Sequence, residues 1–325
     1  MAESIYEKKK ALFFNVETTS GTYLAPGATA FILTENFQCD PVNAQREKIE
    51  VYSDSTGLYN AELLAQINAT FKFNVPHSWP AVAPAAAAGF LPIAPLLQCC
   101  GAKAPAYVAG PPANITYSEQ TDLQSVNSGS LSFRRTRGAT TQLERKSAGV
   151  RGSVGLEWEI GKVPRWSFDM MGSWLALASA TSLTSTAGAQ LTNLDLPAAS
   201  NTIGAITLGG KNLCLTKLSN KNLFRLKVNW AKYLCGEGAI PSIEPANDIT
   251  ATFKWPNIDT EFNPDAYLNN SYPLVFNLLQ AGGSRSLNMS YTSVQVLSYK
   301  EVSIGEELGC EMTLRQTSPI AMNTQ

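Results

Sequence analysis

The feature that most constrains the fold is a strict alternation of apolar and polar side chains in several short segments. From Ile67 to Val75 every second residue is apolar, and the residues between them are Asn, Thr or Lys. The same period of two recurs at residues 154–160, 224–230 and 249–255 and near the C-terminus. Alternation with one polar face is typical of antiparallel sheets that are buried on one side and wet on the other. The sequence therefore predicts a mainly β fold.

One of these strands occurs twice. Residues 69–73 are ATFKF and residues 251–255 are ATFKW, 182 positions later. At the same offset, Leu-Leu-Gln at 96–98 matches 278–280, and Leu-Thr at 33–34 matches 215–216. Three matches at one offset favour an internal duplication. A length of 325 residues also suits two domains with a core each.

We therefore expect two tandem, duplicated β-sandwich or barrel domains, each with one short helix. The first helix is expected near Ala94 to Cys99, ending at Gly101. The second is expected in residues 272–283, because Pro273 suits a helix start and two glycines suit its end. The domains are expected at residues 1–178 and 206–325, separated by a Ser/Thr/Ala-rich linker at 179–205.

Composition excludes several classes of protein. With 16% charged and 44% hydrophobic residues, the chain is globular and not disordered. A formal net charge of −1 does not support general attraction to nucleic acid or to an anionic membrane. Residues 81–102 carry no charge, but three prolines interrupt them, so they make a poor membrane span. Six cysteines without any CxxC spacing predict free thiols.

The motifs of common catalytic sites are missing from the sequence. His77 is the single histidine, and no glycine-rich phosphate loop or paired-histidine zinc motif occurs. Glu157 and Glu159 share one strand face, which suits either a glycosidase pair or, as we prefer, a solvated polar face. The sequence thus predicts no catalytic, cofactor or metal site, and a protein that is not an enzyme.

A basic segment stands out near the middle of the chain. Residues 130–152 predict a long hairpin arm with a turn at residues 138–141. Three interpretations stay open: a nucleic-acid patch, a solvated hairpin whose charges prevent edge pairing, and an arm that docks on an acidic neighbour. The absence of interleaved aromatic residues argues against the first. The basic residues expected to contact an adjacent copy are Arg134, Arg135, Arg137, Arg145 and Lys146.

Three stretches together resemble the major tail tube proteins of long, non-contractile-tailed bacteriophages. The resemblance covers most of the chain, although each motif is short. The matching positions are Glu17, Thr18, Thr19 and Gly21, then Leu96, Leu97, Cys100 and Gly101, then Gly161, Pro164 and Phe168.

This resemblance implies two tail-tube-like β-sandwich or barrel domains and a structural function in the virion. In that family, inner strands join side by side into rings, and the rings stack into a tube through which DNA leaves the capsid. The implied partners are further copies of the chain, the tape measure, tail terminator and baseplate proteins, and genomic DNA that passes without specific binding. The implied location is the phage tail, assembled in the host cytoplasm.

Two tube domains in one chain let three copies build a pseudo-six-fold ring. We favour this trimer over a hexamer in which one half decorates the outside. We expect the basic arm to contact the adjacent ring, and Glu157 and Glu159 to face a neutral or acidic lumen. The alternative function is a carbohydrate- or receptor-binding β-sandwich of the tail.

Overall fold

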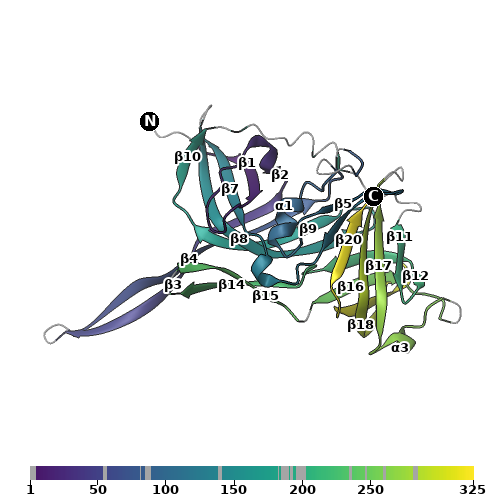
Figure 1. Ribbon diagram of the computed structural model, residues 1–325. Helices are drawn as coiled ribbons and strands as arrows, with labels where there is room; N and C mark the ends of the chain where they lie inside the picture. The colour runs from purple at the N-terminus through teal and green to yellow at the C-terminus, as the bar shows by residue number, and fades with distance from the viewer. Residues whose placement is uncertain are drawn as a thin grey trace.

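The computed structural model describes residues 5–53, 57–80, 82–84, 89–137, 141–181, 183, 190, 193–194, 203–233, 236–245, 247–258, 261–280 and 285–325. Over these residues the chain consists mainly of antiparallel strands, which confirms the mainly β class (Figure 1). In the described part of the chain two short α-helices have defined bounds, one in each half.

The elements fall into a first and a second half along the chain. The first half contains β1 (Ile5–Val16), β2 (Phe31–Ile32), β3 (Glu35–Ser53), β4 (Gly57–Pro76), α1 (Ala94–Cys99), β5 (Ala106–Val108), β6 (Asn114–Ser118), β7 (Gly129–Arg137), β8 (Thr141–Glu159), β9 (Arg165–Trp174) and β10 (Ala178–Thr181). The second half contains β11 (Ile203–Leu208), β12 (Lys211–Leu213), β13 (Leu215–Asn220), β14 (Leu226–Tyr233), β15 (Gly236–Ile243), β16 (Asp248–Lys254), α3 (Pro264–Tyr267), β17 (Ser271–Leu279), β18 (Ser286–Ile304), β19 (Glu307–Gln316) and β20 (Ile320–Thr324). Single 3-10 turns lie at Ala28–Ala30 and Leu123–Ser125.

Both halves use the same strand-pairing scheme. In the first half, β1 pairs with β2 and β7, β8 pairs with β7, β9 and β10, and β4 pairs with β3 and β9. In the second half, β11 pairs with β12 and β17, β18 pairs with β17, β19 and β20, and β16 pairs with β13 and β19. Each strand of the first set thus has a counterpart in the second.

The repeated ATFK segment lies on two of these counterparts, β4 and β16. Ala69 and Phe71 of β4 are buried, as are Ala251 and Phe253 of β16. The other two matches at the same offset do not coincide in the fold. Residues 96–98 lie in helix α1, whereas Leu278 lies in strand β17, and residues 33–34 precede β3, whereas Leu215 begins β13.

The first predicted helix is confirmed as α1, but the second prediction is wrong. Residues 271–279 form strand β17, and the helix of this half, α3, precedes it. Pro273 lies where the register between β17 and β18 shifts, a position at which a residue without an N–H is tolerated. The β-favouring residues Val275 and Phe276 then pair with β18. Glycines 282 and 283 lie outside the described residues.

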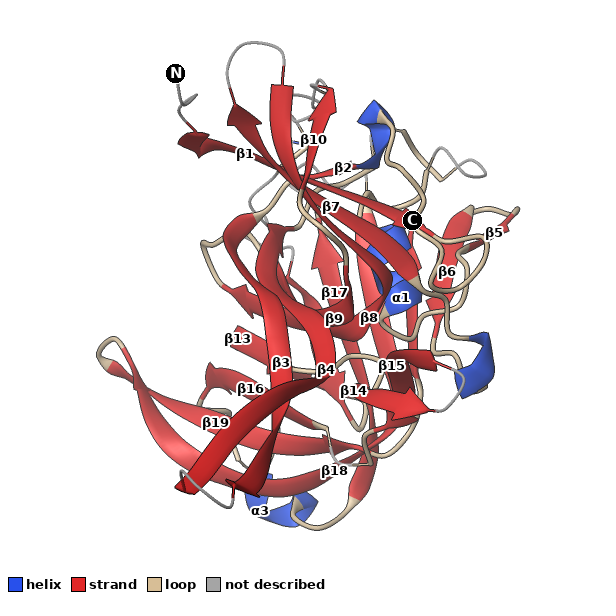
Figure 2. Cartoon of the chain, turned by 90° about the vertical axis from the view of Figure 1, so that its left-hand side faces the viewer, coloured by secondary structure: helices blue, strands red, loops and turns tan. Residues whose placement is uncertain are grey.

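The two halves share one sheet and one core. β13 pairs with β8, so the order β3–β4–β9–β8 continues into β13–β16–β19–β18, and these eight strands are called the central sheet (Figure 2). β20 also pairs with β6 of the first half. Trp158 of β8 packs on Phe276 of β17 with ring centroids 5.9 Å apart. The boundaries proposed for two domains stay a prediction, and most of the linker at 179–205 lies outside the described residues.

The segment predicted as a free basic arm is a hairpin, but it is not a free two-stranded arm. β7 and β8 form it, and their outer edges pair with β1 and β10, so it is the middle of a four-stranded sheet. The hairpin that projects from the molecule is instead β3–β4, whose strands pair as far as Ser53 and Gly57 (Figure 1). Within the described residues, no helix has the length and hydrophobicity needed to cross a membrane.

Candidate assembly surface on the central sheet

The described part of the central sheet has one apolar face and one polar face, because side chains alternate along its strands between the register shifts in β3, β8, β13 and β18. On β4, for example, Phe71 and Phe73 point into the core, whereas Thr70 and Lys72 point away from it. The polar face is formed by Gln38, Asp40, Thr70, Lys72, Asn74, Ser153, Glu157, Glu159, Arg165, Ser167, Asp169, Lys217, Ser219, Thr250, Thr252, Lys254, Ser298, Lys300, Glu311, Thr313 and Arg315.

Strand register aligns these residues in rows that run across both halves. One row passes through Arg165, Glu157, Ser219, Thr250, Thr313 and Ser298, each the Cα partner of the next. A second passes through Glu159, Lys217, Thr252, Glu311 and Lys300. The strands of the two halves therefore present one continuous polar surface, including Glu157 and Glu159.

Positive charges on this face have carboxylate partners within the chain. Lys72 Nζ lies 2.8 Å from Asp169 Oδ2, and Lys300 Nζ lies 2.7 Å from Glu311 Oε1. Further pairs join Lys162 to Glu159, Arg165 to Glu35, Lys254 to Glu307 and Arg315 to Asp248. Exposed pairs of this kind add little stability, about 0–1 kcal/mol each. Their consequence is a surface with alternating, locally balanced charge.

The pKa values follow these contacts. The hydrogen bond and the charge of Asp169 raise the pKa of Lys72. The hydrogen bond from Lys162 lowers the pKa of Glu159, and the charges of Lys162 and Lys217 act in the same direction. Both shifts favour the charged form of the side chain, the ammonium of Lys72 and the carboxylate of Glu159.

Three shallow hollows are described on the polar face, and one of them, of about 220 Å³, is lined by Gln38, Cys39, Asp40, Thr70 and Lys72. One of about 320 Å³ is lined by residues that include Gln38, Lys72 and Asp169, and one of about 170 Å³ is lined by residues that include Glu159 and Lys217. The described residues that line the last two hollows contain neither histidine nor cysteine, so these two offer no such base or nucleophile.

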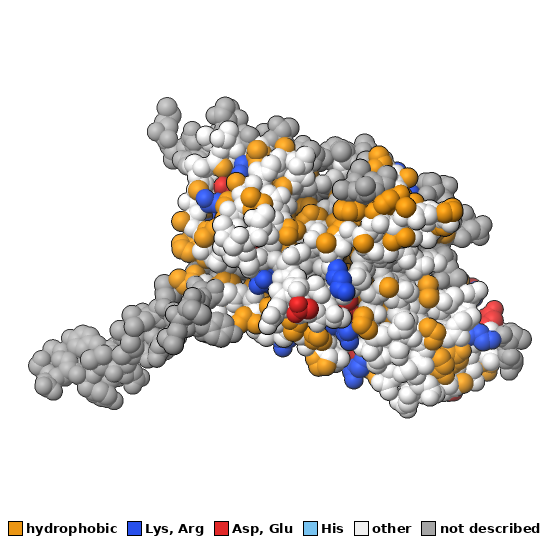
Figure 3. Space-filling model, in the orientation of Figure 1, with side chains coloured by type: hydrophobic (Ala, Val, Ile, Leu, Met, Phe, Trp, Pro, Cys, Tyr) orange, Lys and Arg blue, Asp and Glu red, His pale blue; other side chains and the backbone are white. Residues whose placement is uncertain are grey.

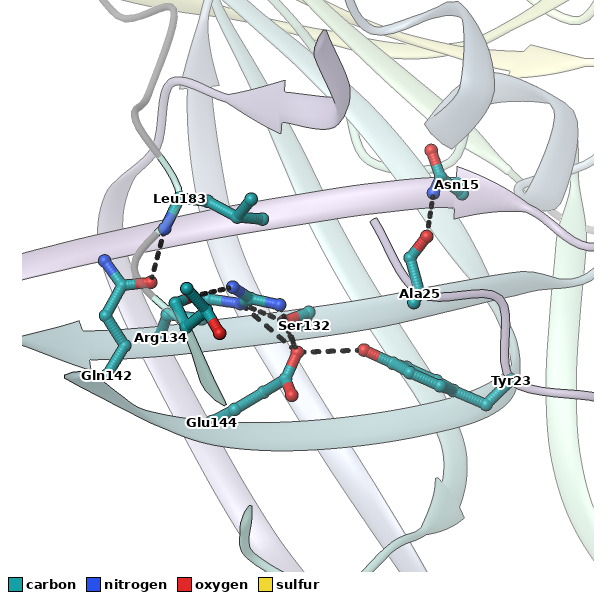
Figure 4. Close-up of polar contacts among 9 residues, drawn as sticks. Asn15, Tyr23, Ala25, Ser132, Arg134, Gln142, Glu144 and Leu183 are labelled. Atoms are coloured by element: carbon teal, nitrogen blue, oxygen red, sulfur yellow. Dashed lines mark hydrogen bonds and ion pairs between the residues drawn. The ribbon is translucent and has the colours of Figure 1, made fainter. Parts of the chain in front are cut away.

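The predicted contact residue Arg134 lies in a different environment from the one expected. It is 6% exposed, and its Nη2 is 2.8 Å from Oε1 of Glu144 on the neighbouring strand. Ser132 and Tyr23 also donate hydrogen bonds to that oxygen, and Arg134 Nη1 donates to the carbonyl of Thr181 (Figure 4). The prediction that Arg134 meets a carboxylate of an adjacent copy is therefore wrong, because its charge is neutralised inside its own fold.

Burial and hydrogen bonding act in opposite directions on this cluster. Burial raises the pKa of Glu144, but the hydrogen bond from Ser132 and the charge of Arg134 outweigh it, so the pKa lies below its ordinary value. Burial and the charge of Glu144 raise the pKa of Tyr23. Glu144 of β8 is therefore a carboxylate with three neighbours, which connects β8 to β7 and to the loop that follows β1.

The other residues of the predicted basic contact are more accessible. Arg135 and Arg145 are half-buried, with Arg135 stacked over Phe133 and Arg145 beside a small groove near Trp174. Lys146 is half-buried and lies over the ring of Tyr23. The side chain of Arg137 lies outside the described part of the chain. A contact of these residues with a second copy stays a prediction.

Glu17, in the first motif of the resemblance, holds three segments together through four hydrogen bonds. Its carboxylate accepts hydrogen bonds from Ser128 (2.7 Å), Ser130 (2.9 Å) and the backbone N–H groups of Gly21 (2.7 Å) and Gly149 (2.8 Å). Gly149 has a positive φ of 63° at the irregularity in β8. The role of Glu17 is thus to position backbone, which the sequence motif alone did not indicate.

His77 is fully buried in the core. Trp166 Nε1 donates to its Nδ1 at 3.2 Å, and Trp79 packs edge-on with ring centroids 4.6 Å away. Burial lowers the pKa of His77 to about 3, so the ring is neutral at physiological pH. Its proton therefore lies on Nε2, which has no hydrogen-bond partner among the described residues.

His, Cys, Asp and Glu are the usual metal-binding side chains, and all four types occur among the described residues. Within them, no group of three His, Cys, Asp or Glu side chains is placed to hold a metal ion. The cysteines that the structure describes are free thiols, with Cys214 exposed and Cys99, Cys100 and Cys310 buried. Burial raises the pKa of Cys310 to about 12, so this thiol is protonated and unreactive.

Comparison with known proteins finds no matching protein-family model and no matching curated protein.

Proposed function

We propose that this chain is a structural virion protein, a major tail tube protein that polymerises into stacked rings and forms the conduit for DNA ejection. The observation that carries the proposal is the pairing of β8 with β13. Through it, two strand quartets of the same internal order form one sheet with one polar face. A sheet of this kind suits the inner wall of a water-filled tube, with the apolar face packed on the core.

The proposal includes a duplicated tube domain and a ring of three chains. Support comes from the counterpart strands of the two halves, which have the same partners and the same order. If each quartet supplies one sixth of the wall, three chains complete it with pseudo-six-fold symmetry. If the second half only decorated the outside of the ring, its strands would not line the channel, although the pairing of β8 with β13 places them in the same sheet as those of the first half.

The charge of the polar face supports passage of DNA without retention. Each free Lys or Arg that contacts a phosphate adds salt-dependent affinity. On the polar face, several cations are paired with carboxylates of the same chain, and Glu157 and Glu159 add negative charge. We propose this face as the lumen lining, and the virion tail as the location, with tape measure, terminator and baseplate proteins as partners.

Electron microscopy of the purified, unmodified chain tests the proposal. We expect rings with three-fold symmetry that stack into hollow tubes as the protein concentration rises. Native mass spectrometry of the shortest assemblies should give multiples of three chains. A protein that stays monomeric at high concentration, or forms assemblies without a central channel, contradicts the proposal.

A further inference from the structure

The seam between the two halves has a defined geometry. β13 runs antiparallel to β8, with Lys217 opposite Glu159 and Asn220 opposite Leu156. Beyond β13 the chain stays against the same edge, since Leu223 N donates to the carbonyl of Val154 at 2.8 Å. β7 pairs with β8 only as far as Val150. The seam thus covers residues 156–159 of β8, which β7 and β10 do not reach.

The counterparts of these two strands are β3 and β18. β3 corresponds to β13 because each pairs with an ATFK strand, with Asp40 opposite Thr70 and Lys217 opposite Thr252. β18 corresponds to β8 because β18 pairs with β17, β19 and β20 in the same way as β8 pairs with β7, β9 and β10. Within the described residues, β3 pairs with β4 alone, and the part of β18 from Ser298 to Ile304 pairs with β19 alone.

We propose that these two edges pair with each other between copies, so that β3 of one chain lies antiparallel to residues 298–304 of the next. This inference rests on the proposed function and names the interface that closes the ring. Unpaired strand edges expose backbone donors and acceptors, and folded proteins cover them. The contact joins different surfaces of the two copies, so it is head-to-tail and produces a closed ring when the rotation fits.

Charges on the four strands select this pairing. In the seam inside the chain, Lys217 of β13 faces Glu159 of β8. In the proposed seam the signs are reversed, because the described polar face carries Asp40 on β3 and Lys300 on β18, where Lys300 also lies 2.7 Å from Glu311 of its own chain. The wrong combinations place Asp40 against the glutamates of β8, or Lys217 against Lys300. Like charges across a strand pair are unfavourable, so the sequence discriminates between the two seams.

The projecting hairpin follows from the same correspondence. In the second half, β13 leads into the hairpin β14–β15, which lies on the first half of its own chain. Arg225 Nη2 is 2.8 Å from Glu119 Oε1 there, and Arg151 Nη1 donates to the carbonyl of Ala239 at 2.9 Å. Figure 3 shows basic side chains in a short band over this region, beside acidic ones. The outer part of β3–β4 is the counterpart of β14–β15, and it would lie on the second half of the neighbouring copy.

Disulfide trapping tests the seam in the intact protein. Gln38→Cys on β3 is combined with Ser298→Cys, Lys300→Cys or Val302→Cys on β18, each in a Cys214→Ser background that removes the exposed native thiol. Opposite residues in antiparallel strands have Cα atoms about 4.5–5.5 Å apart, which suits a disulfide. In at least one of the three double-cysteine variants, we expect mild oxidation of assembled tubes to link most chains into covalent dimers and cyclic trimers. A reductant should return these products to single chains.

A matched control pairs Gln38→Cys with Thr292→Cys, which is exposed on the part of β18 next to β17. It should stay monomeric on denaturing gels. Tubes that form normally but give no covalent trimers with any of the three pairs overturn the seam while leaving the proposed function intact. An unmodified protein that forms no rings overturns the proposed function itself. Equal cross-linking in the control also overturns the seam.

Discussion

Lys217 of β13 and Glu159 of β8 are Cα partners in a strand pair that joins the two halves of the chain. Because both side chains lie on the polar face, their charges are complementary across the seam, and the charge of Lys217 helps to lower the pKa of Glu159. The contact makes one sheet from two quartets of strands. It also provides the pattern from which the contact between copies was inferred.

The first prediction concerns the charges of the proposed seam. Asp40→Lys alone and Lys300→Glu alone should each raise the protein concentration needed for tube assembly, by up to about fivefold, since an exposed pair contributes ~0.2–1 kcal/mol. The double variant should recover most of the loss, because the attraction is restored with reversed sign. Light scattering during assembly measures this. Lys254→Glu is the control on the same face. If the double variant needs a protein concentration as high as the two single effects added together predict, the two residues do not pair.

The second prediction concerns the shared core. Trp158→Ala should lower the free energy of unfolding by about 3–5 kcal/mol, because it leaves a cavity where Phe276 packs. Both halves should still unfold in one transition, at a lower Tm, in differential scanning calorimetry. The control is Trp174→Ala, a side chain that is 41% exposed, with an expected effect within about 0.5 kcal/mol. Two separate transitions in the unmodified protein indicate independent domains and contradict this prediction.

The third prediction separates burial from surface contact at the basic hairpin. Arg134→Met should lower the free energy of unfolding by about 3–5 kcal/mol, since it leaves the buried carboxylate of Glu144 unpaired. Arg134→Met with Glu144→Leu should be much less harmful, because no buried charge is left. Chemical denaturation measures both variants. Arg145→Ser serves as the half-buried comparison, with little expected loss. Arg134→Met with unaltered stability would show that the pair is not formed.

The fourth prediction is a pH dependence caused by His77. Burial lowers its pKa to about 3 in the folded protein, whereas an unfolded histidine has a pKa of about 6.5. Below pH 6.5 the unfolded state therefore binds a proton that the folded state does not, and stability falls as the pH falls. At pH 5 the loss is about 2 kcal/mol. Denaturation of His77→Gln over the same range should show a shallower slope between pH 6.5 and 5, and an equal slope in both proteins excludes His77 as the cause.

The fifth prediction concerns the polar face as a channel lining. Assembled tubes should retain little DNA at moderate salt, because most cations of this face are paired with carboxylates. Glu157→Lys with Glu159→Lys should introduce salt-sensitive retention, with a steeper dependence on salt concentration. Glu157→Gln with Glu159→Gln, which removes the negative charge without adding positive charge, should bind far less. Filter binding of labelled DNA fragments measures all three. Strong, salt-sensitive retention by the unmodified tubes contradicts a lumen of balanced charge.

The sequence by itself determined the elements that depend on local pattern. Alternating apolar residues identified strand β4 and its buried face, and the helical run from Ala94 to Cys99 that ends before Gly101 identified helix α1. The period of two decides which side chains point the same way, and this alone placed Glu157 and Glu159 on a polar face. The ATFK match likewise identified two strands that are counterparts in the fold.

Only the tertiary structure decided what each strand lies beside. Residues 272–283 have a proline and two glycines where a helix would begin and end, yet β11 and β18 provide backbone partners on both sides of residues 271–279 and make them a strand. Arg134 belongs to a basic run in the sequence, but Glu144 and Ser132 from adjacent strand positions neutralise and bury it. The pairing of β8 with β13 joins residues about 60 positions apart. No pattern within either strand indicates this pairing, because the neighbour of a strand is chosen by contacts between residues distant in the sequence.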